Sequence, residues 1–268
     1  MRALMNTAQL RLSLAAPRPA AGFVSRRVAI GGLHLHIRER AGHGRAWVLL
    51  HGLAVSHRYL MPTATALPGP VSVPDLPGFG LSARPIRAYD TEQHAEVVAR
   101  WMTEAGVAGA CLLANSYGCQ VAVELAVRRP ELVAALILVG PTVDPAARSV
   151  PGQFGRWVRD VLLEDPREAM ILAADVRDAG LRRVYRTLRH SVRHRIDQRL
   201  PRVAAPTLVL RGARDPIAPA RWVTEAAALA PDGAAGTVPR AAHNAITTAG
   251  PAVAAQALAF VRRHGLVD

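Results

Sequence analysis

The stretch ANSYG (Ala114–Gly118) directly follows a short apolar run and directly precedes a helical pattern that stops at Pro130. A serine in that position lies on a tight turn between a strand and a helix. The turn raises the serine hydroxyl above the sheet and points the first helical N–H groups toward it. Small residues two positions before and after the serine, Ala114 and Gly118, let such a turn close without clashes. The motif therefore predicts that Ser116 is a nucleophile.

The sequence on both sides of this turn predicts alternating strands and helices. Short apolar runs bounded by turn residues are typical of strands buried on both faces of a parallel sheet; they are Trp47–Leu50, Val71–Val73, Cys111–Ala114, Leu136–Val139 and Thr207–Leu210. Helical patterns lie between or after them, at Thr91–Ala105, Tyr117–Arg129, Ala220–Leu229 and Ala252–Arg263. Near the start, Gly31-Gly32 separates the two halves of a predicted hairpin over residues 25–40. We therefore expect an α/β fold with a doubly wound, mostly parallel sheet.

One segment interrupts this alternation. Residues 146–202 contain helical patterns and no strand run, and an insertion of this length between two sheet strands is commonly a lid. We expect a core made of residues 24–145 and 203–268, a helical lid over 146–202, and a flexible leader over 1–23. The lid is rich in arginine, and Leu181, Val184, Tyr185 and Leu188 recur in it at helical spacing.

Composition excludes several classes of protein. The chain has 268 residues, of which 50% are hydrophobic and 20% charged, so it can bury a core. Its net charge of +13 comes from arginine alone among the basic residues, but aromatic residues are only 4% and no nucleic-acid-binding motif is present. The uncharged stretches 105–123 and 241–260 carry too many polar residues for a membrane span. Cys111 and Cys119 are too few for a disulfide scaffold, and we expect two buried, reduced thiols in a cytoplasmic protein.

A serine nucleophile needs a base and an orienting carboxylate, and both follow it in the chain. Asp215 comes just after the buried run Thr207–Leu210, and His243 lies in a loop after another short run. The order serine, aspartate, histidine matches one known arrangement of a catalytic triad. Asp144 is the alternative position for the acid.

Two upstream motifs agree with this interpretation. The run ending in His51-Gly52-Leu53 can present the N–H of Leu53 beside the N–H of Tyr117, and two such donors stabilise a developing oxyanion. The Gly- and Pro-rich turn that begins at Asp75 is expected to be structural, shaping the loop beside the serine.

These five motifs, in this order, make the chain resemble the α/β-hydrolase superfamily, in its branch with a lid. The resemblance covers residues 24–267. It implies a triad of Ser116, Asp215 and His243 and a reaction without a cofactor. Asn115 and the short His-Gly motif are similar to carbon–carbon hydrolases of ring-fission products, although Cys119 and Asn244 stand where those relatives commonly have glycine and an aromatic residue. Relatives that act on epoxides or haloalkanes use an aspartate nucleophile, which Ser116 opposes.

We therefore expect a serine hydrolase for a small to medium carboxylic ester. Carbon–carbon bond hydrolysis is the alternative reaction, and a non-catalytic scaffold of the same fold is the alternative class. The partner is a small molecule rather than nucleic acid, and the oligomeric state stays open. Candidate pocket residues are His51, Asn115, Trp157, Met170, Tyr185 and Arg189. Arg189 is singled out because the guanidinium fork suits a substrate carboxylate.

No metal site is expected from the histidines. His34, His36 and His43 lack the spacing of metal ligands. His190 and His194 stand four apart, but arginines at 189, 193 and 195 disfavour a cation between them. His57 and His94 are expected to be ordinary helix residues.

Overall fold

The computed structural model describes residue 20, residues 22–164 and residues 166–267; most of the expected leader lies outside this part. The described chain forms one eight-stranded sheet in the spatial order β1-β2-β4-β3-β5-β6-β7-β8. The strands are β1 (Val24–Ile30), β2 (Leu33–Arg40), β3 (Trp47–Leu50), β4 (Val71–Pro74), β5 (Ala110–Asn115), β6 (Val133–Val139), β7 (Thr207–Gly212) and β8 (Gly233–Val238).

Strand direction confirms the expected α/β fold. β1 pairs antiparallel with β2, which pairs antiparallel with β4. From β4 to β8 every pairing is parallel. Gly31 and Gly32 close the predicted hairpin with φ of 54° and 81°, a backbone conformation that glycine adopts without strain. Parallel strands bring their carboxyl ends to one edge of the sheet, and the residues that follow β5, β6, β7 and β8 therefore meet there.

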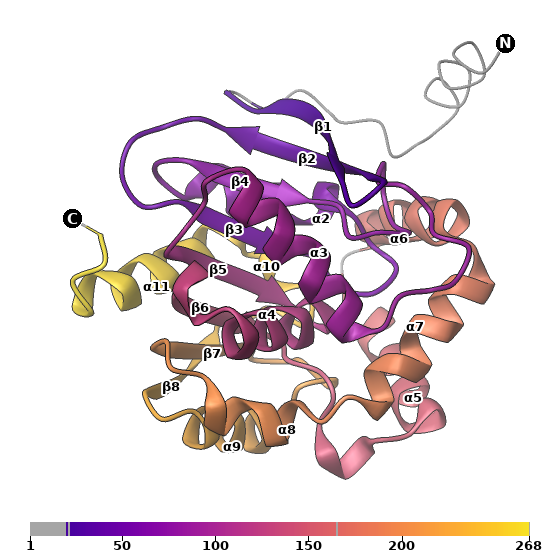
Figure 1. Ribbon diagram of the computed structural model, residues 1–268. Coiled ribbons are helices and arrows are strands. Elements are labelled where there is room, and N and C mark those ends of the chain that lie inside the picture. Colours follow the sequence, from indigo (N-terminus) through magenta and orange to yellow (C-terminus); the bar gives the residue numbers. More distant parts are fainter. Residues whose placement is uncertain (1–19, 21, 165, 268) are drawn as a thin grey trace, which may run out of the picture.

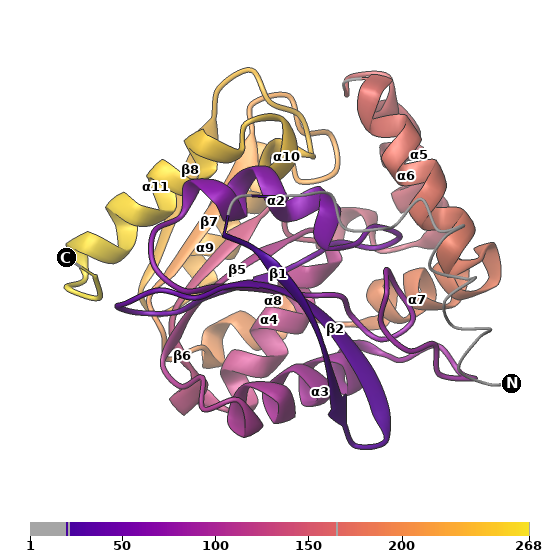
Figure 2. The same ribbon diagram turned by 90° about the horizontal axis from the view of Figure 1, so that it is seen from above.

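Helices cover both faces of the sheet (Figures 1 and 2). α3 (Thr91–Glu104), α4 (Tyr117–Arg128) and α9 (Ala220–Leu229) pack on one face, where their apolar residues join a cluster that includes Trp101 and Trp222. α2 (His57–Ala66), α10 (Ala245–Thr248) and α11 (Gly250–Arg263) lie on the other face, with Tyr59 and Phe260 in a second cluster. The sequence predicted His57 in a helix but not the bounds of α2, which contains Pro62.

The segment between β6 and β7 contains helices and no strand in its described residues. It contains the 3-10 helix η2 (Pro145–Ala147), α5 (Val150–Val161), α6 (Pro166–Ala179), α7 (Leu181–Arg193), α8 (Ile196–Arg199) and the 3-10 helix η3 (Leu200–Arg202). We name residues 145–202 the insertion. α5, α6 and α7 stand together at one side of the sheet in both ribbon views. In the described chain no helix is both long and apolar enough to cross a membrane.

The residues of α7 that are most buried are not the apolar residues whose helical spacing was noted in the sequence. Its two buried side chains are Thr187 and Ser191, whereas Tyr185 is 54% exposed and Leu181 is also exposed. Gln120 of α4 donates from Nε2 to the backbone carbonyl of Ser191 at 3.0 Å, which ties this side of α7 to α4. Of the predicted apolar stripe, Leu181 and Tyr185 therefore face solvent, whereas Val184 and Leu188 are half-buried and Val184 packs against the core.

A buried carboxylate ties the end of α7 to α4. Glu124 accepts a hydrogen bond from His194 Nε2 at 2.8 Å and one from Arg128 Nε at 3.1 Å, and Arg199 Nε lies 2.7 Å away. Burial raises the pKa of Glu124, but the hydrogen bonds from His194 and Arg128 and the charge of Arg199 outweigh it. The pKa of Glu124 falls from 4.5 to about 2.

We expect Glu124→Gln to lower the free energy of unfolding by about 1–3 kcal/mol at neutral pH, because it removes a charged acceptor from Arg128, Arg199 and His194. The folded-state pKa lies below the unfolded value, so this stabilisation is complete above pH 4.5 and is lost as the pH falls toward 2. Denaturant melts of both proteins at several pH values measure it. A difference in stability that stays constant across that interval would contradict this origin.

Candidate active site

Ser116 occupies a strained turn between β5 and α4. Its φ of 54° and ψ of −120° lie where residues with a Cβ rarely occur. The turn is held by a hydrogen bond from the Ser116 N–H to the Val139 carbonyl of β6 at 3.0 Å. Ser116 is also the residue that precedes α4, so the N–H of Tyr117 begins the helix without an intrahelical partner.

Close backbone packing explains the small residues around the serine. A Cβ added at Gly118 would lie 2.5 Å from the Leu50 carbonyl oxygen and 2.6 Å from that of His51, so only glycine fits there. A Cβ added at Gly52 would lie 3.2 Å from the Ser116 Cβ. The chain at Gly52 therefore packs directly against the serine, one residue before Leu53, whose N–H the sequence predicted as an oxyanion donor.

Asp215 and His243 meet at the same edge of the sheet. His243 Nδ1 lies 2.9 Å from Asp215 Oδ2, and both side chains are buried. The other oxygen, Oδ1, accepts hydrogen bonds from the Ile217 and Ala218 N–H groups at 2.8 and 2.9 Å. Because a carboxylate only accepts, the Nδ1 of His243 carries the proton. Its Nε2 is buried and has no hydrogen-bond partner among the described residues, so it is available as an acceptor.

Asn115 connects the serine turn with the histidine loop. Its Nδ2 lies 3.0 Å from the Val139 carbonyl and 3.5 Å from the His243 carbonyl, and its Oδ1 accepts from the Tyr59 hydroxyl at 2.9 Å. Asn115 is almost fully buried. Its side chain therefore holds neighbouring segments together beneath Ser116 rather than lining an open pocket.

Asp144, the alternative acid, has other partners. It forms ion pairs with Arg156 at 2.7 Å and with Arg221 at 2.7 Å, and it accepts from the Ala146 N–H. The structure therefore joins Asp215, not Asp144, to His243.

The hydrogen-bond partners of His51 and His94 determine which ring nitrogen of each carries the proton. His51 Nε2 accepts from the Leu76 N–H at 2.9 Å, so its Nδ1 donates to the Gly52 carbonyl at 2.8 Å. This fully buried histidine positions the Gly52 backbone and does not reach a pocket. His94 Nδ1 accepts from the Tyr117 hydroxyl at 2.9 Å, and burial lowers the pKa of His94 to about 4.

The insertion contributes two carboxylates that the sequence did not reveal. Asp160 of α5 accepts from the His243 backbone N–H at 3.1 Å, and Glu164 accepts from the next N–H, that of Asn244. Asp160 is buried. Two acids one helical turn apart thus hold two consecutive amides of the histidine loop. Their spacing in the sequence could have indicated that Asp160 and Glu164 share one side of a helix, but not that they contact the His243 loop.

These carboxylates influence the base. Burial lowers the pKa of His243, but the charge and hydrogen bond of Asp215, with the charges of Asp160 and Glu164, outweigh burial and raise it to about 9. Burial likewise raises the pKa of Asp160. The imidazole must be neutral to accept a proton from Ser116, so any reaction that uses it should accelerate as the pH rises toward 9.

The value of kcat/KM is expected to increase with pH as His243 loses its proton. We expect Asp160→Asn to move this increase to lower pH. The substitution removes a negative charge that favours the imidazolium, while the amide oxygen can still accept the His243 N–H. A pH–rate profile of a chromogenic ester measures the shift. Asp232→Asn is the control, because Asp232 is exposed and pairs with His264 at 3.3 Å. An unchanged apparent pKa in Asp160→Asn would contradict the coupling.

The remaining pocket candidates lie on the outside. Trp157 of α5 is 42% exposed and packs on Phe154 with ring centroids 5.9 Å apart. Tyr185 and Arg189 of α7 are exposed, because α7 turns Thr187 and Ser191 inward. The structure does not bring these three side chains to Ser116. The side chain of Met170 lies outside the described part.

A second histidine–aspartate cluster lies beneath the turn that begins at Asp75. His36 and His57 approach Asp75 Oδ2 through their Nδ1 atoms at 2.8 and 2.9 Å. One ligand atom from each residue lies within 4.8 Å of the others, so the group could in principle hold a metal ion. However, Asp75 also accepts from the His57 and Leu81 N–H groups at 2.7 and 2.9 Å. Both oxygens of the Asp75 carboxylate thus accept hydrogen bonds from the protein, which supports the structural role expected of Asp75.

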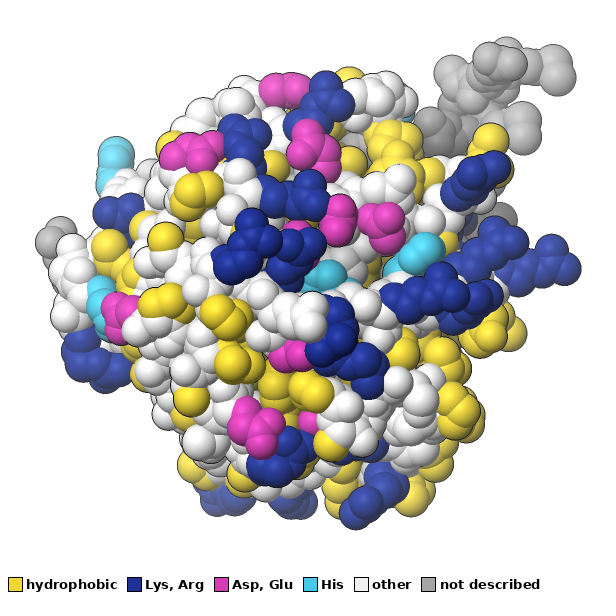
Figure 3. Space-filling view, turned by 60° about the horizontal axis from the view of Figure 1, so that its bottom comes forward, with side chains coloured by type: hydrophobic (Ala, Val, Ile, Leu, Met, Phe, Trp, Pro, Cys, Tyr) yellow, Lys and Arg dark blue, Asp and Glu magenta, His cyan; other side chains and the backbone are white. Residues whose placement is uncertain are grey.

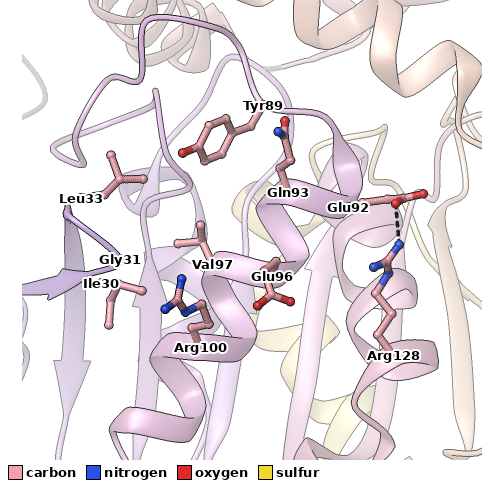
Figure 4. Close-up of a pocket in the computed structure, with 10 residues that line it drawn as sticks. All are labelled: Ile30, Gly31, Leu33, Tyr89, Glu92, Gln93, Glu96, Val97, Arg100 and Arg128. Carbon is pink, nitrogen blue, oxygen red and sulfur yellow. Dashed lines mark hydrogen bonds and ion pairs between the residues drawn. The ribbon is translucent and has the colours of Figure 1, made fainter.

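A cavity of about 370 Å³ lies between the β1–β2 turn and α3 (Figure 4). Gly31 and Leu33 line one side, and Glu96 and Arg100 line the other. None of Ser116, Asp215 and His243 lines it. Its polar side chains come mainly from the outer surface of α3, so we do not assign the chemistry to this cavity.

The fold and the site can now be compared with known proteins. Residues 47–177 match the family described as "alpha/beta hydrolase fold", and residues 186–266 match the family described as "TAP-like protein". The chain belongs to the α/β-hydrolase superfamily. The matched residues include Ser116 in the first region and both Asp215 and His243 in the second.

The individual proteins that this chain resembles are named for different activities. Lipase LipV of Mycobacterium tuberculosis is 32% identical over 138 residues, which are 50% of this chain and 50% of the lipase. A haloalkane dehalogenase of Mycobacterium marinum is 30% identical over 131 residues, 47% of this chain and 44% of the dehalogenase. The chain thus matches about half the length of these relatives.

A solved structure agrees over a longer range. The structure of a thermophilic esterase from Thermogutta terrifontis superposes with a TM-score of 0.76 and covers 91% of this chain and 100% of that chain. The two sequences are 20% identical, so the likeness shows the fold alone.

Proposed function

We propose that this member of the α/β-hydrolase superfamily is a serine hydrolase that cleaves small to medium carboxylic esters through an acyl-enzyme. One observation carries the proposal: His243, hydrogen-bonded at Nδ1 to Asp215, keeps a buried, unpartnered Nε2, and Asn115, the neighbour of Ser116 in its strained turn, approaches the His243 carbonyl at 3.5 Å. A serine at the turn favours acyl transfer over the halide displacement named for the dehalogenase relative, for which a carboxylate nucleophile would be expected.

The residues would act in sequence. Ser116 Oγ attacks the ester carbonyl carbon while His243 Nε2 takes the hydroxyl proton, and the backbone N–H groups of Leu53 and Tyr117 stabilise the oxyanion. The imidazolium then gives its proton to the departing alkoxide, which leaves as an alcohol. A water molecule attacks the acyl-enzyme with His243 again as base, and the carboxylic acid is released. Asp215 holds the imidazole orientation and supports its positive charge.

Charge beside the base favours a neutral acyl group. Asp160 and Glu164 approach the backbone of the His243 loop, whereas Arg189, the residue predicted to bind a substrate carboxylate, is exposed on α7. An ester with a free carboxylate on its acyl side should therefore react more slowly than its neutral methylated analogue. The opposite preference would instead favour the carbon–carbon hydrolase alternative, whose substrates are acids.

Labelling with a fluorophosphonate tests the proposed chemistry. Folded protein should be labelled at Ser116, the label should be absent in Ser116→Ala, and hydrolysis of short aryl esters should disappear with it. A protein that is labelled and cleaves a ring-fission dienoate but no aryl ester would contradict the ester assignment. It would favour carbon–carbon bond hydrolysis instead. A folded protein that is neither labelled nor active would favour the non-catalytic scaffold.

A further inference from the structure

α5 is an amphipathic helix whose polar side faces the protein. Gln153, Arg156, Asp160 and Glu164 lie along one side of α5 and the turn that follows it. Gln153 donates to the Ala147 carbonyl at 2.8 Å, and Arg156 donates to the Ile217 carbonyl at 2.9 Å and to Asp144. Asp160 and Glu164 hold the histidine loop. Every one of these inward side chains is therefore engaged by hydrogen bonds.

The opposite side of α5 is apolar and faces solvent. Phe154 is 57% exposed and Leu162 is 81% exposed, and the other large apolar residues exposed there are Trp157, Val158, Val161 and Leu163. Positions 154, 158, 161 and 162 recur at the spacing of one helical face. A surface of this kind on a soluble domain marks an interaction site more often than a solvated face.

Positive charge surrounds this apolar face. Arg159 is exposed on α5, and α7 carries four exposed arginines, Arg182, Arg186, Arg189 and Arg193. The two helices are neighbours, because Arg148, just before α5, donates to the His194 carbonyl at the end of α7. In the described side chains of the insertion, no aspartate or glutamate is exposed. Dark-blue and yellow side chains gather together on the side of the space-filling view where the insertion lies (Figure 3).

We propose that the outer face of α5, with the arginines of α7, docks on an anionic lipid surface. Apolar side chains on one face of a helix, bordered by arginine, match the chemistry of helices that lie in the headgroup region. Lipid phosphates attract the arginines, at about 1 kcal/mol for each residue near the surface. A second copy of the chain fits less well, because two arginine-rich faces would repel one another. Docking does not depend on the proposed hydrolysis.

Tryptophan fluorescence gives a direct test. Trp47, Trp101 and Trp222 are buried, so Trp157 is the exposed tryptophan of the four in the chain. Vesicles of phosphatidylglycerol and phosphatidylcholine should shift the emission of Ser116→Ala protein to shorter wavelength and carry the protein into the vesicle pellet. The Ser116→Ala background prevents any lipid turnover. Vesicles of phosphatidylcholine alone should do neither, and added salt should weaken binding to the anionic vesicles.

Variants separate the two contributions to docking. Phe154→Ser with Leu162→Ser should raise the vesicle Kd about tenfold or more, since two large apolar side chains no longer enter the lipid. Arg159→Gln and Arg189→Gln should each raise it about fivefold. Val24→Ser is the control: Val24 is 57% exposed, like Phe154, but lies on β1.

Three results would overturn the proposal. They are equal binding to neutral and anionic vesicles, an unchanged Kd in the double serine variant, and a Trp157 shift that follows protein concentration without lipid. The last result, with dimers in sedimentation velocity, would assign the face to a second copy. Circular dichroism and thermal melts confirm that each variant is folded, which is expected because the replaced side chains are exposed.

Discussion

Replacing Asp215 with asparagine is expected to lower kcat/KM for an aryl ester about 10⁴-fold, whereas Asp144→Asn keeps kcat/KM close to the wild-type value. The contrast follows from the partners of the two acids. Asp215 accepts the Nδ1–H of His243, while Asp144 pairs with Arg156 and Arg221. An amide at position 215 turns an N–H toward Nδ1 and favours the wrong tautomer, in which Nε2 is protonated and cannot act as a base.

The fold should survive the substitution at Asp215. In the wild-type protein the Ile217 and Ala218 N–H groups donate to Asp215 Oδ1, and the amide oxygen of asparagine can accept the same two hydrogen bonds. Asp144→Asn removes the negative charge from between two arginines, so it should lower the melting temperature instead. Steady-state kinetics and thermal melts of both variants distinguish the roles. An Asp144→Asn protein that is folded and inactive, beside an active Asp215→Asn, would reverse the assignment.

The same reasoning applies to the whole triad. Ser116→Ala and His243→Ala are each expected to reduce kcat by several orders of magnitude, up to about 10⁶-fold, and the double variant should lose little more than either one. Additive losses would mean that the two residues do not act as a unit.

The order of motifs in the sequence was enough to predict that Asp215 and His243 meet. Ser116, Asp215 and His243 follow β5, β7 and β8, and the carboxyl ends of parallel strands lie at one edge of a sheet. Only the alternation of apolar runs and helices was needed to expect this. The strained φ of Ser116 also follows locally, because the small residues beside it mark a turn too tight for larger side chains.

The insertion could not be predicted in the same way. Helical spacing identifies two faces of a helix, and the usual expectation is that the apolar face packs inward. In α5 the polar face packs inward, because Asp160 and Glu164 meet amides of a loop about 80 residues away. In α7 the backbone carbonyl of Ser191 accepts a hydrogen bond from Gln120 of α4. Partners distant in sequence decide the orientation of both helices, so Trp157 and Tyr185 lie outside.

Gly140→Ala is expected to reduce kcat/KM on the order of 10²-fold without unfolding the protein. Gly140 follows β6 and has a φ of 59°. A Cβ there would lie 2.9 Å from His243 Nδ1 and Cε1 and 3.1 Å from Asp215 Oδ2. Both partners of the hydrogen bond would have to move, and a displacement of about 1 Å at a catalytic group can cost two orders of magnitude.

Neither partner can yield easily. Asp215 is held by two backbone N–H groups, and the His243 N–H is held by Asp160, so relief of the clash must lengthen or turn the Nδ1–Oδ2 contact. The expected loss is therefore mainly in kcat, with a slower rate of fluorophosphonate labelling at Ser116.

Gly265→Ala separates this clash from backbone strain. Gly265 has a φ of 65°, close to that of Gly140, but an added Cβ there meets nothing within 4 Å. Both alanine variants bear a similar conformational cost, of about 1–2 kcal/mol in the left-handed region. They should lose a similar amount of stability in denaturant melts, and only Gly140→Ala should lose activity. Wild-type kinetics in Gly140→Ala, or an equal loss in Gly265→Ala, would show that contact with the His243–Asp215 pair does not limit the reaction. Because Gly140 touches both members of that pair, its effect and that of Asp215→Asn should be far from additive.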